Sequence, residues 1–112
     1  MRAGRLRHRV TLQSPVETLD SHGQPVKTWA DVADVWAGVE PLRGRERAAI
    51  GPDFHGDAQD INELDTRVPI RYRSDVTIDW RVEFEDRHFE IKAIIDPDMR
   101  HRELDLLCKE VV

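Results

Sequence analysis

The sequence predicts a mostly β domain, a small antiparallel β-barrel or sandwich with one long loop between its early and late strands. Apolar and polar residues alternate with a period of two in several short stretches, which is the pattern of half-buried strands. Turn-forming residues separate these stretches at the spacing typical of all-β domains. Because the 112 residues show no repeat or linker, we expect one domain over residues 1–112.

The first strand is expected over residues 5–13. Even-numbered positions from Leu6 to Leu12 are apolar apart from His8, so the arginines between them form a row on the exposed face. Ser14 and Pro15 are expected to end this strand, because proline removes a ladder hydrogen bond.

A turn is expected over residues 20–25, which contain Asp, Ser, Gly and Pro. The flanking residues 15–19 and 26–29 would then form the two arms of a hairpin. The next run, residues 35–39, is apolar at every position and is closed by Pro41, which predicts a strand that is central or faces a neighbour.

The long loop is expected over residues 42–65, where no strand pattern is visible. Residues 46–50 are compatible with a short helix, which Gly51 and Pro52 would end. Residues 53–65 carry five carboxylates and neither lysine nor arginine. A connection of this length is uncommon inside a compact domain and is usually functional.

The second half of the chain predicts four regular strands. Apolar residues alternate with charged ones over residues 68–72, 80–84, 89–95 and 104–108. Short polar turns at residues 74–75, 85–87 and 96–98 separate these strands, which favours antiparallel pairing of sequence neighbours.

Charge and cysteine content narrow the classes of protein. The formal net charge is −5, whereas a general nucleic-acid coat protein would be basic. The single cysteine, Cys108, rules out an intramolecular disulfide, and no apolar run approaches the length of a membrane span. The charged N-terminus differs from a secretory signal. We therefore expect synthesis in a cytoplasm and no contact with a membrane.

The sequence contains no recognisable set of catalytic residues. It has no phosphate-binding glycine loop, no paired histidine motif and no serine in a nucleophile-elbow context. The five histidines are scattered without metal-ligand spacing, and Cys108 has the parity of a buried apolar residue. We expect no enzyme activity, and neither a cofactor nor a metal site.

The order of motifs resembles the phage head–tail joining family, also called head-closure or stopper proteins of long-tailed phages. The chain begins GRLRHRVTLQSP, continues with DSHGQPVKTW and VWAGVEPLRGRE, and ends with VPIRYRSDVTIDWRVEFEDRHFEIKAIIDPDMRHRELDLLCKEV. It departs from the family's pattern at residues 65–67, where a Thr-His pair is frequent, and at residues 85–87, where a glycine is frequent. Both departures lie at turns or strand entries.

The resemblance implies a virion structural protein made in the host bacterial cytoplasm and located in the neck between head and tail. It would be monomeric when free and would form a homo-oligomeric ring in the particle. The ring would lie beneath the portal and adaptor complex and above the tail-completion protein. It would close the DNA exit channel, with packaged DNA passing its lumen and residues 42–65 near that channel.

Two groups of residues are candidates for contacts in this assembly. The subunit or adaptor interface candidates, for which arginine's bidentate binding of carboxylates is the motive, are Arg5, Arg7, Arg9, Trp36, Arg71 and Arg73. The channel-loop candidates are Arg43, Arg45, Asp53, Asp57, Asp60, Glu63 and Asp65.

Two alternatives stay open for the exposed residues. The arginine row is equally compatible with a plain solvated strand face. A β-barrel that binds single-stranded nucleic acid would instead stack bases on Trp29, Trp36 and Trp80.

Overall fold

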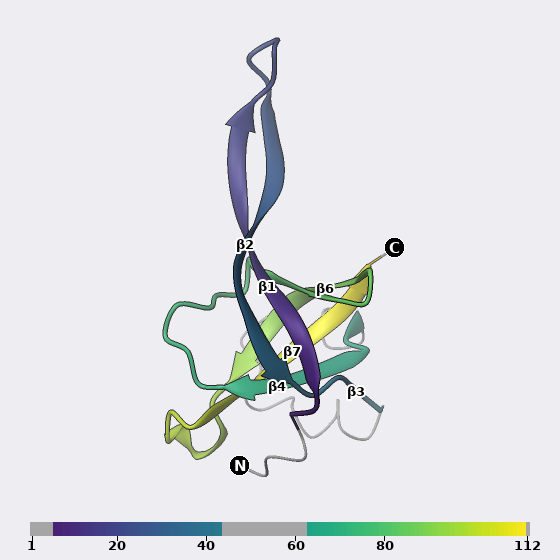
Figure 1. The fold of residues 1–112 in the computed structure, drawn as a ribbon, viewed down its shortest axis with the longest axis vertical. Coiled ribbons are helices and arrows are strands. Elements are labelled where there is room, and N and C mark those ends of the chain that lie inside the picture. Colours follow the sequence, from purple (N-terminus) through teal and green to yellow (C-terminus); the bar gives the residue numbers. More distant parts are fainter. Residues whose placement is uncertain (1–5, 44–62, 112) are drawn as a thin grey trace.

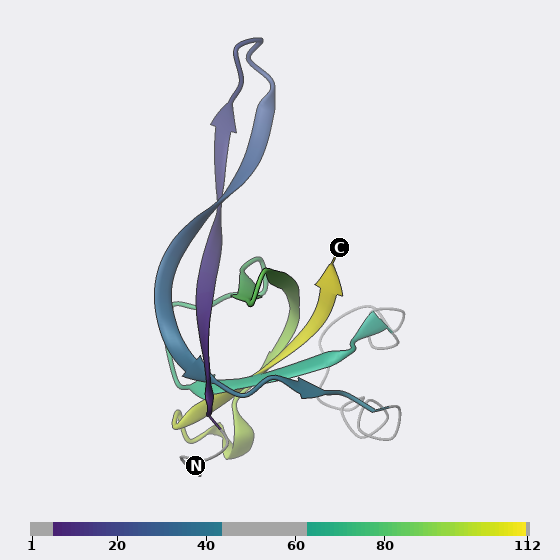
Figure 2. The same ribbon diagram turned by 45° about the vertical axis from the view of Figure 1, so that its right-hand side comes forward.

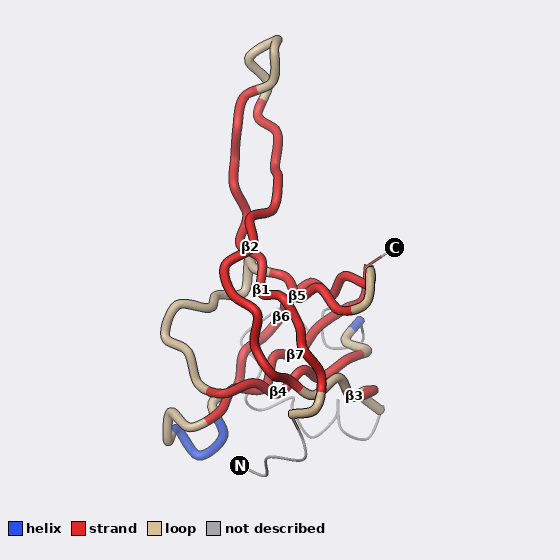
Figure 3. The backbone as a smooth tube through the Cα atoms, in the orientation of Figure 1, coloured by secondary structure: helices blue, strands red, loops and turns tan. Residues whose placement is uncertain are grey.

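The computed structural model describes residues 6–43 and 63–111, and within them it forms one antiparallel sheet (Figures 1 and 3). The strands are β1 (His8–Leu19), β2 (Pro25–Ala37), β3 (Glu40–Pro41), β4 (Thr66–Arg71), β5 (Arg81–Phe84), β6 (Arg87–Ile95) and β7 (Glu103–Val111). A 3-10 turn, η3 (Pro97–Met99), connects β6 to β7. The mostly β, antiparallel fold class predicted from the alternation is confirmed.

The sheet closes on itself. Its strands follow the order β2-β1-β5-β6-β7-β4-β3, and Ala37 of β2 also pairs with Ile70 of β4. Six strands therefore form a closed ring, and β3 pairs with β4 beside it. The strands thus form one curved sheet rather than two stacked sheets.

The apolar side chains of this closed sheet form its main core. Val10 and Leu12 of β1 are buried there against residues of β5, β6 and β7 such as Val82 and Phe89. A smaller cluster of Leu42, Leu64 and Leu107 lies where the described chain leaves β3 and enters β4. The alternation in the second half of the sequence correctly identified the inward-facing residues of β4, β5 and β7, and those of β6 as far as Ile91. It is wrong beyond a register shift between Ile91 and Ala93, where Ile94 packs against the main core while Ala93 and Ile95 pack against the smaller cluster.

The prediction that Ser14 and Pro15 end the first strand is wrong. β1 continues through both residues to Leu19, and Pro15 pairs with Trp29 of β2. Beyond Gln13 no third strand of the described chain pairs with β1, so the missing proline N–H removes no hydrogen bond from a ladder. The predicted hairpin is confirmed and is longer than expected.

The strand expected over residues 35–39 is central in the sheet at Ala37, which pairs with both His8 and Ile70, but Trp36 next to it is exposed. Its side chain is 53% exposed, whereas Ala37 beside it is fully buried. Because the closed sheet is a single layer, each strand covers the core with one face only, and alternate side chains point to solvent.

Two turns show how the sequence shapes the hairpins. At the β1–β2 tip the Asp20 carboxylate accepts hydrogen bonds from the backbone N–H groups of His22 and Gln24, at 2.8 and 2.9 Å. Gly23 takes a φ of 77°, which suits glycine. At the β5–β6 turn, Glu85 and Asp86 take φ values of 52° and 62°, the left-handed geometry that right-twisted two-residue hairpins need. The short helix expected over residues 46–50 lies outside the described residues.

Candidate assembly interface

An exposed arginine–tryptophan patch lies where β1, β2 and β4 meet. Arg9 pairs with Trp36, and its guanidinium carbon lies 5.3 Å from the centre of the indole ring. Ala37 of β2 pairs with Ile70 of β4 in antiparallel fashion, so Trp36 and Arg71, one residue further on each strand, lie across from each other. Arg7, two residues before Arg9, is also exposed. Residues distant in sequence thus form one surface, which we call the arginine–tryptophan patch: Arg7, Arg9, Trp36 and Arg71.

Arg73, another interface candidate, is engaged by its own chain. Its guanidinium donates two hydrogen bonds to Asp75, at 3.0 and 2.8 Å. The hydrogen bond from Arg73 holds the pKa of the Asp75 carboxyl below its usual range, against a smaller opposing effect of burial. A carboxylate from another protein would have to displace Asp75 to bind Arg73 in the same way. Arg5 lies outside the described residues.

A second cationic and aromatic group lies on the outer face of the hairpin, and the sequence did not reveal it. Lys27 and Arg81 lie over the Trp29 ring at 4.6 and 4.4 Å from its centre. Gln13 accepts a 2.6 Å hydrogen bond from Arg81 and donates one of 2.8 Å to Asp31. These contacts tie the hairpin to β5. Arg81 is more than fifty residues from Trp29 in the sequence, and only the fold brings them together.

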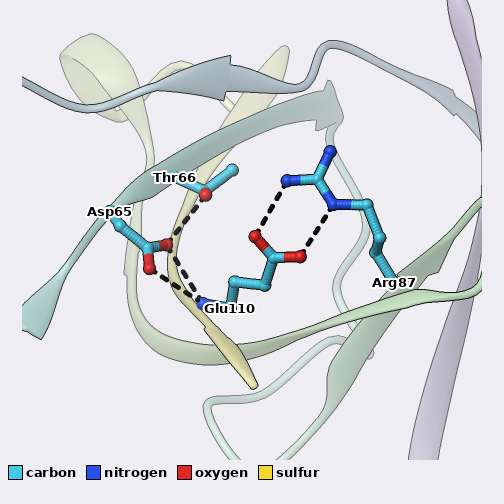
Figure 4. Close-up of polar contacts among 4 residues, drawn as sticks. All are labelled: Asp65, Thr66, Arg87 and Glu110. Carbon is cyan, nitrogen blue, oxygen red and sulfur yellow. Dashed lines mark hydrogen bonds and ion pairs between the residues drawn. The ribbon is translucent and has the colours of Figure 1, made fainter. Parts of the chain in front are cut away.

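The two described ends of residues 42–65 are joined at the sheet. The Leu42 N–H donates to the Asp65 carbonyl at 2.9 Å, and the Asp65 carboxylate accepts bonds from Thr66 Oγ1 and the Glu110 N–H (Figure 4). Arg87 in turn donates to both oxygens of Glu110, at 2.7 and 2.8 Å, which lowers the pKa of that carboxyl. Asp65, a channel-loop candidate, therefore anchors β4 to β7.

The other channel-loop candidates divide into two sets. Arg43 and Glu63 are exposed, and Glu63 lies 3.8 Å from the Lys109 ammonium. The rest lie outside the described residues: Arg45, Asp53, Asp57 and Asp60.

Chemically reactive side chains do not converge in the described ranges. Within residues 6–43 and 63–111 no group of three His, Cys, Asp or Glu side chains could hold a metal ion. His88 pairs with Glu83 and His101 with Asp96, each locally. Cys108 is fully buried, and burial, with a smaller effect of Asp65, raises the pKa of its thiol. In the described part of the chain no helix is long and apolar enough to span a bilayer.

The closed sheet, the long hairpin and the arginine–tryptophan patch define a small β protein whose distinctive features are contact surfaces. The family model for the phage head completion protein matches residues 1–111, so the chain belongs to that family. Head completion protein gp7 of Enterobacteria phage HK97 is 29% identical over 114 residues, which cover 97% of this chain and 96% of gp7.

Two solved structures have the same fold. Protein SF1141 from Shigella flexneri 2a matches with a TM-score of 0.72 and 28% identity, covering 98% of this chain and 96% of that one. A chain in the virion of the native gene transfer agent particle matches with a TM-score of 0.63 at 23% identity, covering 96% and 97%. The head–tail joining resemblance is confirmed, and the chain is a structural component of the phage virion.

Proposed function

We propose that this virion protein forms a homo-oligomeric ring beneath the portal and adaptor, closes the DNA exit channel after packaging, and presents a surface to the tail-completion protein. The observation on which the proposal rests is the match to the head completion family over residues 1–111. Its role is assembly and not catalysis, and the free chain is monomeric.

The arginine–tryptophan patch supplies one contact of this ring. Trp36 exposes 53% of its surface, and tryptophan and arginine are the residues most enriched at the centres of protein interfaces. The partner surface, on a neighbouring copy or the adaptor, offers carboxylates, which arginine binds with two parallel hydrogen bonds. The chain has 22 acidic residues of its own, so a second copy meets this requirement.

The acidic run in residues 53–65 suits a channel through which DNA passes. A lumen lined by carboxylates repels phosphates and so prevents the duplex from adhering to the wall. The bonds among Leu42, Asp65, Thr66 and Glu110 support this role, because they hold the two ends of the loop at one place on the sheet.

The alternative of a single-stranded nucleic-acid binder is not favoured. Trp29 and Trp80 line a hollow together with Lys27 and Lys92 but also with Asp79 and Glu90, so the hollow is of mixed charge and not the basic groove that a phosphate backbone favours. Trp36 lies seven residues further along β2 than Trp29, roughly 23 Å at the rise of a strand. The three rings therefore do not form one stacking platform.

Electron microscopy of lysates from a parent phage lacking this gene tests the proposal. We expect separate tails together with tailless heads, and heads that have lost their DNA indicate that the ring also retains it. Normal tailed particles would refute the proposed function, and complementation with the wild-type gene is the control.

A further inference from the structure

The β1–β2 hairpin extends well beyond the closed sheet. β5 pairs with β1 only at residues 11–13, and β4 pairs with β2 only at Ala37. Residues 14–30 therefore form a two-stranded ribbon that projects beyond the closed sheet, as Figure 2 shows, with its base held by the contact of Arg81 with Trp29; we call this segment the arm. A two-stranded ribbon by itself is only marginally stable in water, so a covering surface would stabilise it.

One face of the arm lacks charge altogether. It continues the face on which Val10 and Leu12 are buried, and the register gives its cross-strand pairs as Ser14 with Ala30, Val16 with Thr28 and Thr18 with Val26. Val16 and Val26 are each 38% exposed. These six residues, the uncharged strip, are small or β-branched and carry no charge, and they lie outside the core.

The two threonine hydroxyls of the strip are bonded to the backbone of the arm itself. Thr28 Oγ1 donates to the Val16 carbonyl at 3.2 Å, and Thr18 Oγ1 donates to the Val26 carbonyl at 3.4 Å. A threonine whose hydroxyl is bonded to the backbone presents its methyl group to the outside. The strip therefore suits contact with an apolar surface.

The opposite face of the arm has an apolar end. Leu19 pairs with Pro25 at the tip and is 71% exposed, and Pro15 pairs with Trp29 nearer the body. Between them Glu17 pairs with Lys27, so the two charges offset each other. The arm thus has two different faces at the same position along its length. A head-to-tail contact between copies in a ring requires two such different faces.

Strand addition at the edges of the arm is disfavoured. Each edge contains a proline, Pro15 or Pro25, which lacks a backbone donor, and a charged residue, Glu17 or Lys27. Prolines and charges are the features that protect edge strands from pairing with another chain. The arm is therefore suited to contact through its faces.

We propose that the uncharged strip of one arm packs against the Leu19 face of the arm of the adjacent copy in the assembled particle. This inference rests on the ring of the proposed function. Three cross-strand pairs offer far less than the roughly 800 Å² per partner of a stable complex, and two chains of net charge −5 repel each other. The contact therefore forms only between copies that the particle already holds together.

Disulfide trapping in assembled particles tests this arrangement, because buried Cys108 does not compete. Particles containing the double variant Val16→Cys/Leu19→Cys should give a ladder of covalent multimers of this chain on oxidation, and each single variant should give only monomer. Homodimers from Val16→Cys alone would show that like faces meet and would overturn the proposal. So would attachment to a different protein, or no cross-link from the double variant.

A charge variant provides an independent test. Val16→Glu should leave the purified chain monomeric and folded but reduce the yield of tailed particles at least tenfold in complementation. Val32→Glu is the matched control, because Val32 is 40% exposed on the same hairpin but lies outside the strip. Wild-type yield from Val16→Glu would overturn the inference. The proposed function itself fails only if the gene deletion leaves normal tailed particles.

Discussion

Replacing Trp36 by alanine should separate the assembly role of the arginine–tryptophan patch from the stability of the fold. In the free chain 53% of Trp36 is exposed and the remainder contacts its own chain, including Arg9. The substitution therefore removes two contributions of similar size, one from the free chain and one from the assembled ring.

The magnitudes follow from the exposed fraction. For a side chain of roughly 200 Å², the 53% that is exposed amounts to roughly 100 Å². Burying that area in an interface contributes about 2.5 kcal/mol at about 25 cal/mol per Å². This energy corresponds to an affinity change of about 60-fold. The free energy of unfolding falls by at most about the same amount, which leaves most domains of marginal stability folded.

Purified protein can be titrated into the lysate of the gene deletion, which is expected to contain tailless heads and separate tails, while tailed particles are counted by electron microscopy. We expect Trp36→Ala to require about 60-fold more protein than wild type for half-maximal completion. Ile78→Ala is the matched control, because Ile78 is 62% exposed but lies in the loop between β4 and β5, outside the patch. If folded Trp36→Ala completes heads at the wild-type concentration, the patch is not an interface.

Three further predictions concern the fold. Cys108 should react with a thiol reagent only after denaturation, because burial raises the pKa of its thiol; fast labelling of the native chain would contradict its placement. The change Glu85→Asn/Asp86→Gly should raise the free energy of unfolding by about 1 kcal/mol in urea titrations, because both residues have positive φ; a loss of stability would argue against this turn. The hydrogen bonds from Arg87 lower the pKa of the Glu110 carboxyl in the folded chain. The stability that this ion pair contributes is therefore complete above the unfolded-state pKa and is lost as pH falls through the folded-state pKa. Between neutral and acidic pH the Tm of the wild type should fall by more than the Tm of Glu110→Gln, and equal decreases would exclude this contribution.

Alternation predicted the second half of the fold because each of those strands has one buried and one exposed face. Val68 and Ile70 of β4, like Phe89 and Ile91 of β6, face the core as expected. The same rule was insufficient for the hairpin. A proline such as Pro15 ends a strand only where a neighbour needs its N–H, and the sequence does not reveal which strands lack a neighbour.

The candidate surfaces depended on register, which the alternation does not determine. A shift between Leu12 and Gln13 changes which residues of β2 share a face with those of β1 beyond it. The uncharged strip follows from that shift. Likewise, the arginine–tryptophan patch exists because a single pair, Ala37 with Ile70, closes the sheet.

Trp36 of the patch and the arm lie on the same hairpin but at different positions along its length. Val16 pairs with Thr28, which is eight residues from Trp36 on β2, and this separation corresponds to roughly 26 Å at the rise of a strand. Substitutions separated by this distance are expected to have additive effects. Trp36→Ala and Val16→Glu should therefore impair assembly independently. Trp36 makes its contact near the closed sheet, whereas Val16 makes its contact on the arm, beyond the closed sheet. A continuous hairpin is suited to this arrangement, since its cross-strand pairing fixes the position of the arm relative to the closed sheet.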